Sequence, residues 1–272
     1  VQIRLEGHDQ HRDFWSNDLP GRLDAMTPED VDAGSYDLAV LAIQEPQYAN
    51  HSIATLLAVL AEAEVPCLSV MNMRPLPFLK RIPAIEIGRV EAAYASPWVW
   101  QRFNPDLVSH WSPDPQAMRP PGQKANVLLV GLATNFKAAA VGSAKATVLL
   151  SELSESIDEV RVIGQEVPVK LRRHRSIFAP FAKWSMLMAG NYRCVTTDAP
   201  ISIHDAVCQM PDLAREVYEV TGEIVLRLGG TRDDLVPFEK YAKAALCLNK
   251  PSSVARAIDE GAPVVERVDR LI

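Results

Sequence analysis

A strand–helix–strand pattern in the first third of the sequence constrains the fold more than any other feature. Residues 36–43 (YDLAVLAI) form a short, continuous apolar run, which is typical of a strand buried on both faces. Residues 51–64 then show the apolar spacing of a helix, and Pro66 separates that helix from a second apolar run at 67–71 (CLSVM). Two buried strands joined by a helix within about 35 residues predict a right-handed βαβ unit of a parallel sheet.

The rest of the sequence predicts an α/β domain followed by an all-helical domain. Residues 126–133 (NVLLVGLA) indicate another strand, and residues 144–160 indicate a helix. From about residue 176 onward the apolar spacing is helical almost throughout. The helical candidates in this part are residues 176–190, 203–228, 237–246 and 252–272. We therefore expect residues 1–169 to form the α/β domain and residues 170–272 to form the helical domain.

Charge and cysteine content exclude several classes of protein. The chain has 28 basic and 34 acidic residues, a net charge of −6, and so lacks the basic surface of a nucleic-acid-binding protein. We interpret the short basic run at 170–175 (KLRRHR) as a solvated helix end rather than a phosphate site. The 4 cysteines are scattered without a CxxC pair, which argues against zinc and disulfides and for a reducing compartment. Without a secretory signal or a long apolar span, the sequence predicts a cytoplasmic protein with no membrane partner.

The segment 181–196 (FAKWSMLMAGNYRCVT) places Lys183 and Asn191 in an apolar, helix-forming run. Eight residues rotate an α-helix by two turns plus about 80°, so both side chains can point toward one cleft. A lysine in apolar surroundings is costly unless its charge is used or paired. The alternative is an ordinary amphipathic helix whose lysine extends to solvent. The spacing alone leaves both interpretations open.

Other polar residues stand where α/β folds bind ligands. Asn72 follows the second strand of the predicted βαβ unit, at the carboxyl end of the sheet, although such an amide can also cap the next turn. Ser252 and Ser253 begin a predicted helix after Pro251, where a serine is either an N-cap or a donor to a substrate carboxylate. Glu266 is either a solvated helix residue or part of the same site.

Several catalytic motifs are missing from the sequence. It contains neither GxGxxG nor GxxxxGK[ST], so it has no recognisable phosphate-binding loop. It also lacks a GxSxG elbow and a Ser-His-Asp order, which leaves little support for a hydrolase. His8 and His11 form an HxxH pair near Glu6, but no third ligand accompanies them, so we predict no metal site.

Four segments in this order resemble the ketopantoate reductase family, the NADP-dependent 2-dehydropantoate 2-reductases and their relatives. DLAVLAIQEPQ resembles the family strand DLVLLAVKAxQ, and LSVMNM resembles VSLQNG. FAKWSMLMAGN resembles WxKLxxNxxxN, and KPSSVARAIDEGAP resembles RxSSMLQDxxxGRxTE. The resemblance extends from about residue 38 to the end of the chain. Each motif is weak alone, and the order and spacing of the four carry the resemblance.

The resemblance assigns roles to individual residues. It implies that Lys183 is the catalytic general acid, which protonates the nascent alkoxide and has a pKa lowered toward neutrality. It implies that Asn191 and Ser253 orient the substrate's hydroxyl and carboxylate. Asn72 would lie against the lysine and the cofactor, and Glu266 would pair with the substrate or the lysine.

The sequence also departs from the family pattern at several of these positions. Gln44 stands where the family has a lysine that helps to hold the cofactor, and Met73 replaces the glycine after the asparagine. Leu187 takes the place of the first active-site asparagine. The family's glutamate falls on Val265 by ungapped spacing, and on Glu266 only after one inserted residue.

The resemblance implies a Rossmann-like domain, N-terminally incomplete, followed by an all-α domain like the C-terminal domain of 6-phosphogluconate dehydrogenase. The first strand and glycine-rich turn would occupy about 25–30 residues before Val1, so they either precede this chain in a longer protein or have been lost. The implied function is hydride transfer from NADPH to a 2-oxo acid or related carbonyl, in a protein compatible with a homodimer. The sequence does not decide NADP over NAD, because that choice is made at the end of the second strand.

Two alternatives to this reductase remain open at the level of the sequence. One is a non-catalytic, dimeric binding protein that retains the fold. The other is an opine-dehydrogenase-like enzyme, which shares the two-domain plan and would need an amino-acid co-substrate.

Overall fold

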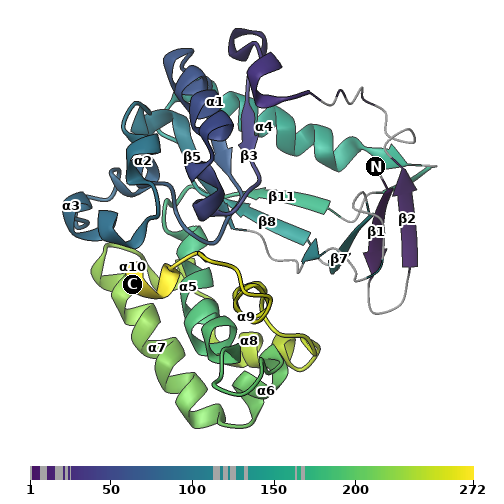
Figure 1. Ribbon diagram of the computed structural model, residues 1–272, viewed down its shortest axis with the longest axis vertical. Coiled ribbons are helices and arrows are strands. Elements are labelled where there is room, and N and C mark those ends of the chain that lie inside the picture. The colour runs from purple at the N-terminus through teal and green to yellow at the C-terminus, as the bar shows by residue number, and fades with distance from the viewer. Residues whose placement is uncertain are drawn as a thin grey trace.

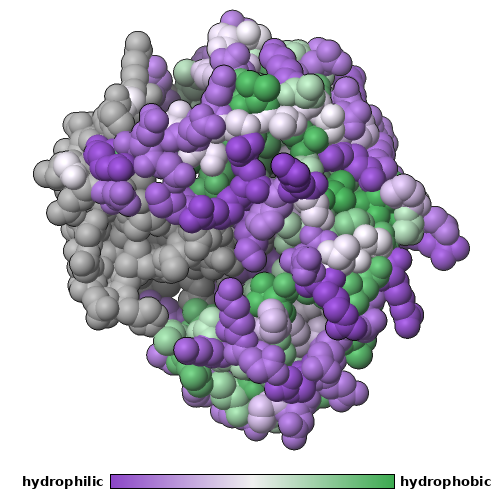
Figure 2. Space-filling view, turned by 180° about the vertical axis from the view of Figure 1, so that it is seen from behind, coloured by the Kyte–Doolittle hydropathy of each residue, from purple (hydrophilic) through white to green (hydrophobic). Residues whose placement is uncertain are grey.

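The computed structural model describes residues 2–6, 11–15, 21, 24, 26–112, 117–118, 122, 127–131, 134–162, 164–166 and 169–272. These residues form a sheet-containing part, which includes the N-terminal strands, and a helical part that ends at α10 (Figure 1). On the opposite face, hydrophilic side chains cover most of the described surface, with hydrophobic residues between them (Figure 2). None of the helices within the described ranges is long and apolar enough to cross a membrane.

The main sheet has five strands in the order β11-β8-β5-β4-β3. Its strands β3, β4 and β5 are mutually parallel, β5 and β8 are antiparallel, and β8 and β11 are parallel. The strands are β3 (Ala39–Leu41), β4 (Cys67–Ser69), β5 (Val108–Ser112), β8 (Thr134–Ala138) and β11 (Val169–Arg173). The predicted βαβ unit is confirmed, because α1 (His51–Glu62) connects the neighbouring parallel strands β3 and β4.

Two layers of helix cover the two faces of this sheet. On one face, Leu57 and Leu60 of α1 belong to the same buried cluster as Leu41 and Cys67. On the other face, the predicted helix at 144–160 is confirmed as α4 (Ala144–Glu159). Leu150 of α4 is buried in a second cluster whose other members come from the strands, namely Leu68, Trp111, Ala138 and Leu171. Because side chains alternate along a strand, β4 and β5 contribute residues to the clusters on both faces of the sheet.

The basic run at 170–175 was interpreted as a helix end, and the structure shows that this was wrong. Residues 169–173 form β11, paired with β8. Leu171 is buried, while Arg172 and Arg173 are exposed, so an edge strand with one buried side chain accommodates the basic residues. The chain leaves the sheet at Arg173, a few residues beyond the predicted boundary at 169/170. The domain bounds 1–169 and 170–272 stay a prediction.

A smaller sheet with the strand order β2-β1-β7-β6 lies beside the main one (Figure 1). It contains β1 (Gln2–Glu6), β2 (His11–Trp15), β6 (Ala117–Met118) and β7 (Val127–Gly131), and a separate hairpin joins β9 (Arg161–Val162) to β10 (Gln165–Glu166). The strand predicted at 126–133 is thus confirmed as β7. His8 lies outside the described residues, and only the backbone of Glu6 and His11 is described.

The helical part contains more breaks than the sequence pattern predicted. Its helices are α5 (Ala182–Met186), α6 (Ile203–Cys208), α7 (Pro211–Arg227), α8 (Phe238–Ala245), α9 (Ser253–Asp259) and α10 (Val268–Leu271). Two further short helices, α2 (Leu76–Leu79) and α3 (Ile87–Val90), belong to the sheet-containing part. The helix predicted over 203–228 is divided before Pro211, which cannot donate a backbone hydrogen bond. The helix predicted over 252–272 ends at Asp259, and Gly261 follows in a left-handed conformation (φ 78°).

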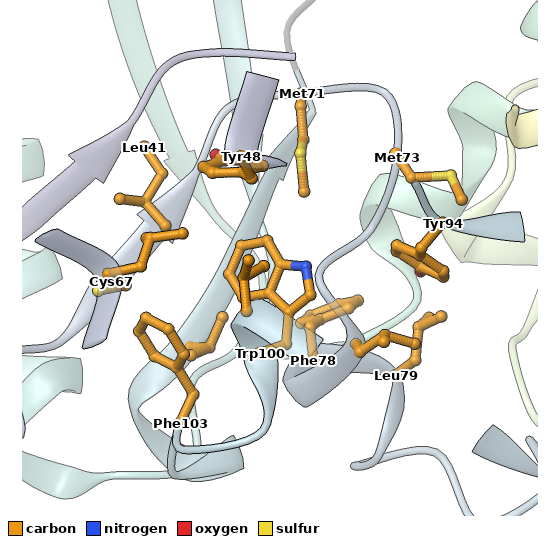
Figure 3. Packing of buried hydrophobic residues seen from close by; sticks show 14 of the residues in the cluster. Leu41, Tyr48, Cys67, Met71, Met73, Phe78, Leu79, Tyr94, Trp100 and Phe103 are labelled. Carbon is orange, nitrogen blue, oxygen red and sulfur yellow. The ribbon is translucent and has the colours of Figure 1, made fainter. Parts of the chain in front are cut away.

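The largest buried cluster joins the two parts. Trp100 lies at its centre in the sheet-containing part, with Tyr48 and Phe103 against its ring (Figure 3). The same cluster takes in Trp184 from α5 and Leu271 from α10. Because helices after residue 180 complete this core, the helical part is fixed against the carboxyl ends of β3 and β4. A second cluster, under α6, α7 and α8, holds the helical part together internally.

Candidate functional site

A small pocket lies where the helical part meets the carboxyl ends of β3 and β4. Its lining comes from five places in the sequence: Gln44, Asn72, Leu187, Asn191, Tyr192, Ser253, Val254, Ala257, Val265 and Glu266. Carboxyl ends of parallel strands are where open α/β sheets bind ligands. Six of the ten lining side chains offer amide, hydroxyl or carboxylate groups and the other four are apolar, so the lining suits a polar ligand with an apolar portion.

The pocket brings together five of the six site residues that the sequence predicted. These are Gln44, Asn72, Asn191, Ser253 and Glu266. Lys183 is not among the lining residues. It is partly buried in α5, one helical turn before Leu187, which does line the pocket.

The two amide residues follow adjacent strands. Gln44 precedes a short 3-10 turn at Glu45–Ala49 and is exposed. Asn72 follows β4, and its Nδ2 donates a hydrogen bond to Glu266 Oε2 at 3.2 Å. The alternative for Asn72 was a cap of the following turn, whereas its amide reaches across the junction to the C-terminal segment.

Glu266 is buried, with 5% of its surface exposed, and lies between α9 and α10 rather than in a helix. Its Oε1 accepts hydrogen bonds from the backbone N–H groups of Glu45 at 3.3 Å and Met73 at 3.4 Å. Burial raises the pKa of this carboxyl, and the three donated hydrogen bonds partly oppose that shift. Glu266 is thus not a solvated helix residue, and its carboxylate connects the segments after β3 and β4 to the C-terminal segment.

Tyr192 fixes the backbone that carries Glu266. Its hydroxyl donates to the carbonyl oxygen of Glu266 at 2.7 Å and accepts from the N–H of Val268 at 2.9 Å. Burial raises the pKa of this phenol, so it remains a neutral hydrogen-bonding group. Sequence reasoning missed Tyr192, and its position directly after Asn191 was the available signal.

Two buried charged residues beside the pocket were also missed. Glu45 has 1% of its surface exposed and Arg74 has 0%. The backbone N–H of Ala95 donates to Glu45 Oε1 at 2.9 Å, and burial raises the pKa of this carboxyl. Both charges come within five residues of the end of a strand, in AIQE after β3 and in MNMR after β4. A charged residue so close to a strand of the core indicates a functional or structural role, because a buried charge needs hydrogen-bonding partners.

A π-helical turn at Leu187–Asn191 separates Lys183 from Asn191. The calculation of about 80° between the two side chains assumed an unbroken α-helix, and this assumption was wrong because α5 ends at Met186. The turn is compatible with its surroundings because residue 190 is glycine: a Cβ there would lie 2.0 Å from the hydroxyl of Tyr241. That hydroxyl donates to the carbonyl of Met186 at 3.1 Å, at the start of the wide turn.

The two serines at the start of α9 have different surroundings. Ser252 is the N-cap, with Oγ accepting from the N–H of Ala255 at 3.3 Å and donating to the carbonyl of Asn191 at 2.6 Å. Ser253 is the first residue of α9 and lines the pocket. The N-cap interpretation thus applies to Ser252. Within the described residues, no group of three or more His, Cys, Asp or Glu could hold a metal ion.

No protein-family model and no curated protein matches this chain. Several solved structures resemble it along nearly its whole length, among them the following three. A protein assigned as a ketopantoate reductase from Ralstonia solanacearum MolK2 is 13% identical with a TM-score of 0.61, and the match covers 98% of this chain and 82% of that one. The dimeric ketopantoate reductase from Staphylococcus aureus is 11% identical with a TM-score of 0.57, covering 97% and 75%.

The third structure is a D-mandelate dehydrogenase with NADH and anilino(oxo)acetate, 11% identical with a TM-score of 0.52, covering 99% of this chain and 77% of that one. At such identities these likenesses concern the fold. The chain has the fold of the ketopantoate reductases, with a Rossmann-like N-terminal domain followed by a helical C-terminal domain. The resemblance predicted from the four sequence motifs is confirmed at this level.

Proposed function

We propose that this chain, which has the fold of the ketopantoate reductases, is an NADPH-dependent reductase of a 2-oxo acid or a related carbonyl compound. The observation that carries the proposal is the convergence of motif residues in one pocket: Asn72, Asn191, Ser253 and Glu266 are far apart in sequence and line the same cavity. The D-mandelate dehydrogenase of the same fold, with NADH bound, supports a nicotinamide cofactor. The dimeric neighbour supports a homodimer as the assembly.

The amide residues fit the nicotinamide end of such a cofactor. Gln44 and Asn72 follow adjacent parallel strands and both line the pocket. Each carries a donor and an acceptor, as does the carboxamide of nicotinamide. When bound, the reduced nicotinamide would supply the hydride. The diphosphate of such a cofactor requires a glycine-rich turn, and the sequence contains no GxGxxG, so this assignment concerns the nicotinamide end alone.

Within the proposal, Lys183 is the general acid that delivers a proton to the carbonyl oxygen as it becomes an alkoxide. Lys183 belongs to α5, the helix directly before the π-helical turn that carries Leu187 and Asn191 of the lining, and this proximity supports the role. Asn191 and Ser253 would orient the substrate's hydroxyl and carboxylate. Glu266, held by Asn72 and two backbone N–H groups, would accept a hydrogen bond from the substrate.

The test combines cofactor binding with a matched pair of lysine variants. NADPH and NADH are titrated into the protein while nicotinamide fluorescence is followed, and a panel of 2-oxo acids is then assayed. Lys183→Ala should lower kcat by about 10²–10⁴ and leave the melting temperature near that of the wild type. Lys240→Ala, which removes an exposed lysine from α8, serves as the control and should keep the wild-type kcat. An ordinary kcat in Lys183→Ala would refute the assignment of the general acid.

One observation favours a second candidate, the opine-dehydrogenase-like enzyme. Glu266 is the single charged residue among those that line the pocket. Because no cation accompanies this carboxylate in the lining, the pocket attracts the ammonium group of an amino acid more than the carboxylate of a 2-oxo acid. Amino acids added to the 2-oxo acid panel separate the two enzymes: a rate that requires both compounds identifies the opine type. If neither nicotinamide binds, the non-catalytic binding protein is favoured over both.

A further inference from the structure

Arg74 is the most deeply buried charge in the part of the chain that the structure describes, with 0% of its surface exposed. It follows Asn72 by two residues, and its Nη1 donates to the carbonyl of Asn72 at 2.7 Å. Its Nη2 donates to the carbonyl of Pro180, which is 106 residues away in the sequence. One planar side chain thus bridges the turn after β4 and the segment that leads into α5.

The residues on either side of Lys183 hold the same guanidinium. Its Cζ lies 4.9 Å from the ring centroid of Phe181 and 5.2 Å from that of Trp184. These distances are within the range of cation–π attraction. Arg74 therefore fixes both the backbone before Lys183 and the aromatic side chains that flank it.

Stability alone does not explain an arginine in this position. Burial lowers the pKa of Arg74 to about 9, and the nearby carboxylate of Glu266 opposes the shift. Burying a charge carries a desolvation cost that an apolar side chain of similar volume does not have. What an apolar side chain could not provide is the pair of directed hydrogen bonds to two backbone segments.

We propose that Arg74 is a positioning residue for the reduction, which holds the turn of Asn72 and the segment of Lys183 at a fixed separation. This inference rests on the proposed function. Asn72 also donates to Glu266, so the same bridge extends to the carboxylate in the pocket. Loss of the bridge would let the amide, the carboxylate and the general acid shift relative to one another. Misplacement of reacting groups by about 1 Å can cost a hundredfold in rate.

The test uses Arg74→Met and Arg74→Lys, with Arg81→Met as a matched control. Arg81 makes the same kind of bridge away from the pocket, since its Nη1 donates to the carbonyls of Val108 at 3.4 Å and Ala140 at 2.8 Å. Methionine keeps most of the volume of arginine without the hydrogen bonds, and lysine keeps the charge on a single nitrogen. Lysine cannot replace a fork that reaches two carbonyls at once.

Both Arg74 variants should lose about tenfold to a hundredfold in kcat, with KM for the 2-oxo acid changed by less than about threefold. Arg81→Met should lower the melting temperature and keep kcat within about twofold of the wild type. If the Arg74 variants fold and keep the wild-type kcat, or if Arg81→Met loses as much kcat as they do, the proposal is overturned. Should Arg74→Met fail to fold, Arg74→Lys decides alone.

A second measurement does not depend on activity. The backbone N–H groups of Glu45 and Met73 donate to Glu266, so hydrogen exchange reports directly on this arrangement. In Arg74→Lys these two amides should exchange at least about tenfold faster, and in Arg81→Met they should not. Unchanged exchange in Arg74→Lys counts against the proposal. A wild type that reduces no 2-oxo acid refutes the proposed function, and exchange then decides the role of Arg74 separately.

Discussion

The π-helical turn before Asn191 depends on a glycine, and replacing that glycine is expected to disturb both stability and the site. In Gly190→Ala the new Cβ would lie 2.0 Å from the Tyr241 hydroxyl and 3.3 Å from Ile203 Cγ2. The hydroxyl must move, and its hydrogen bond to the carbonyl of Met186 is lost. The gain in helix propensity over glycine is about 1 kcal/mol. Overpacking and the lost hydrogen bond each cost about 1–3 kcal/mol, so we expect a net loss near 3 kcal/mol.

A double-mutant cycle isolates the contact between these two side chains. Tyr241→Phe alone removes the donor to Met186 and should cost about 1–3 kcal/mol. In the double variant Gly190→Ala/Tyr241→Phe the severe contact is gone, because the next atom of the ring, Cζ, lies 3.3 Å from the new methyl. The double variant should therefore be at least about 2 kcal/mol more stable than the sum of the two single losses predicts.

Urea denaturation followed by tryptophan fluorescence measures the three variants and the wild type. Additivity within about 0.5 kcal/mol would show that Gly190 and Tyr241 do not compete for the same space, and would refute the reasoning. Activity provides a second readout, since Asn191 directly follows Gly190. Gly190→Ala should lower kcat/KM, and the double variant should recover part of it.

Three more expectations follow from the site. Burial raises the pKa of Glu266 above its usual 4.5, so the folded chain binds this proton more tightly than the unfolded chain. The stability of the wild type relative to Glu266→Gln should therefore fall as pH rises from 4.5 through the folded pKa. Urea midpoints of both proteins, measured across that pH range, test this. Ser252→Ala removes the N-cap of α9 and the donor to Asn191, and should cost about 1–3 kcal/mol in thermal unfolding. Its neighbour Ser253→Ala should change stability by less than about 0.5 kcal/mol and raise KM for the substrate.

The sequence predicted those parts of the fold in which one local signal dominates. The run that became β4 is apolar because β4 is buried throughout, and α1 before it begins at a capping asparagine, Asn50. The strand β7 and the helix α4 were found by the same reasoning. In each case the local pattern and the tertiary environment agree, so the pattern is informative. The prediction that the run of β3 is buried on both faces was wrong, because β3 is an edge strand and Val40 is 47% exposed.

The errors arose where tertiary contacts overrode the local pattern. The basic run of β11 looks like a solvated helix end until its parallel pairing with β8 and its single buried leucine are known. The π-helical turn after α5 is contacted by the hydroxyl of Tyr241, which is about 50 residues further along the chain. Local helix propensity cannot predict a contact with a residue so far away in the sequence. Spacing alone left Val265 and Glu266 as alternatives for the position of the family's glutamate. Both residues line the pocket, so the position in the fold does not separate them either.

The hydrogen bonds of Glu266 restrict how a substrate can be oriented in the pocket. A carboxylate accepts about four hydrogen bonds, and Glu266 already accepts from Glu45, Met73 and Asn72. Of the hydrogen bonds found among the described residues, Oε2 accepts only the one from the Asn72 side chain, so it can also accept from a ligand donor such as a hydroxyl or ammonium. The carboxylate of a 2-oxo acid is repelled by Glu266, so we expect it away from that side chain, with Asn191 and Ser253 among the lining groups that can donate to it.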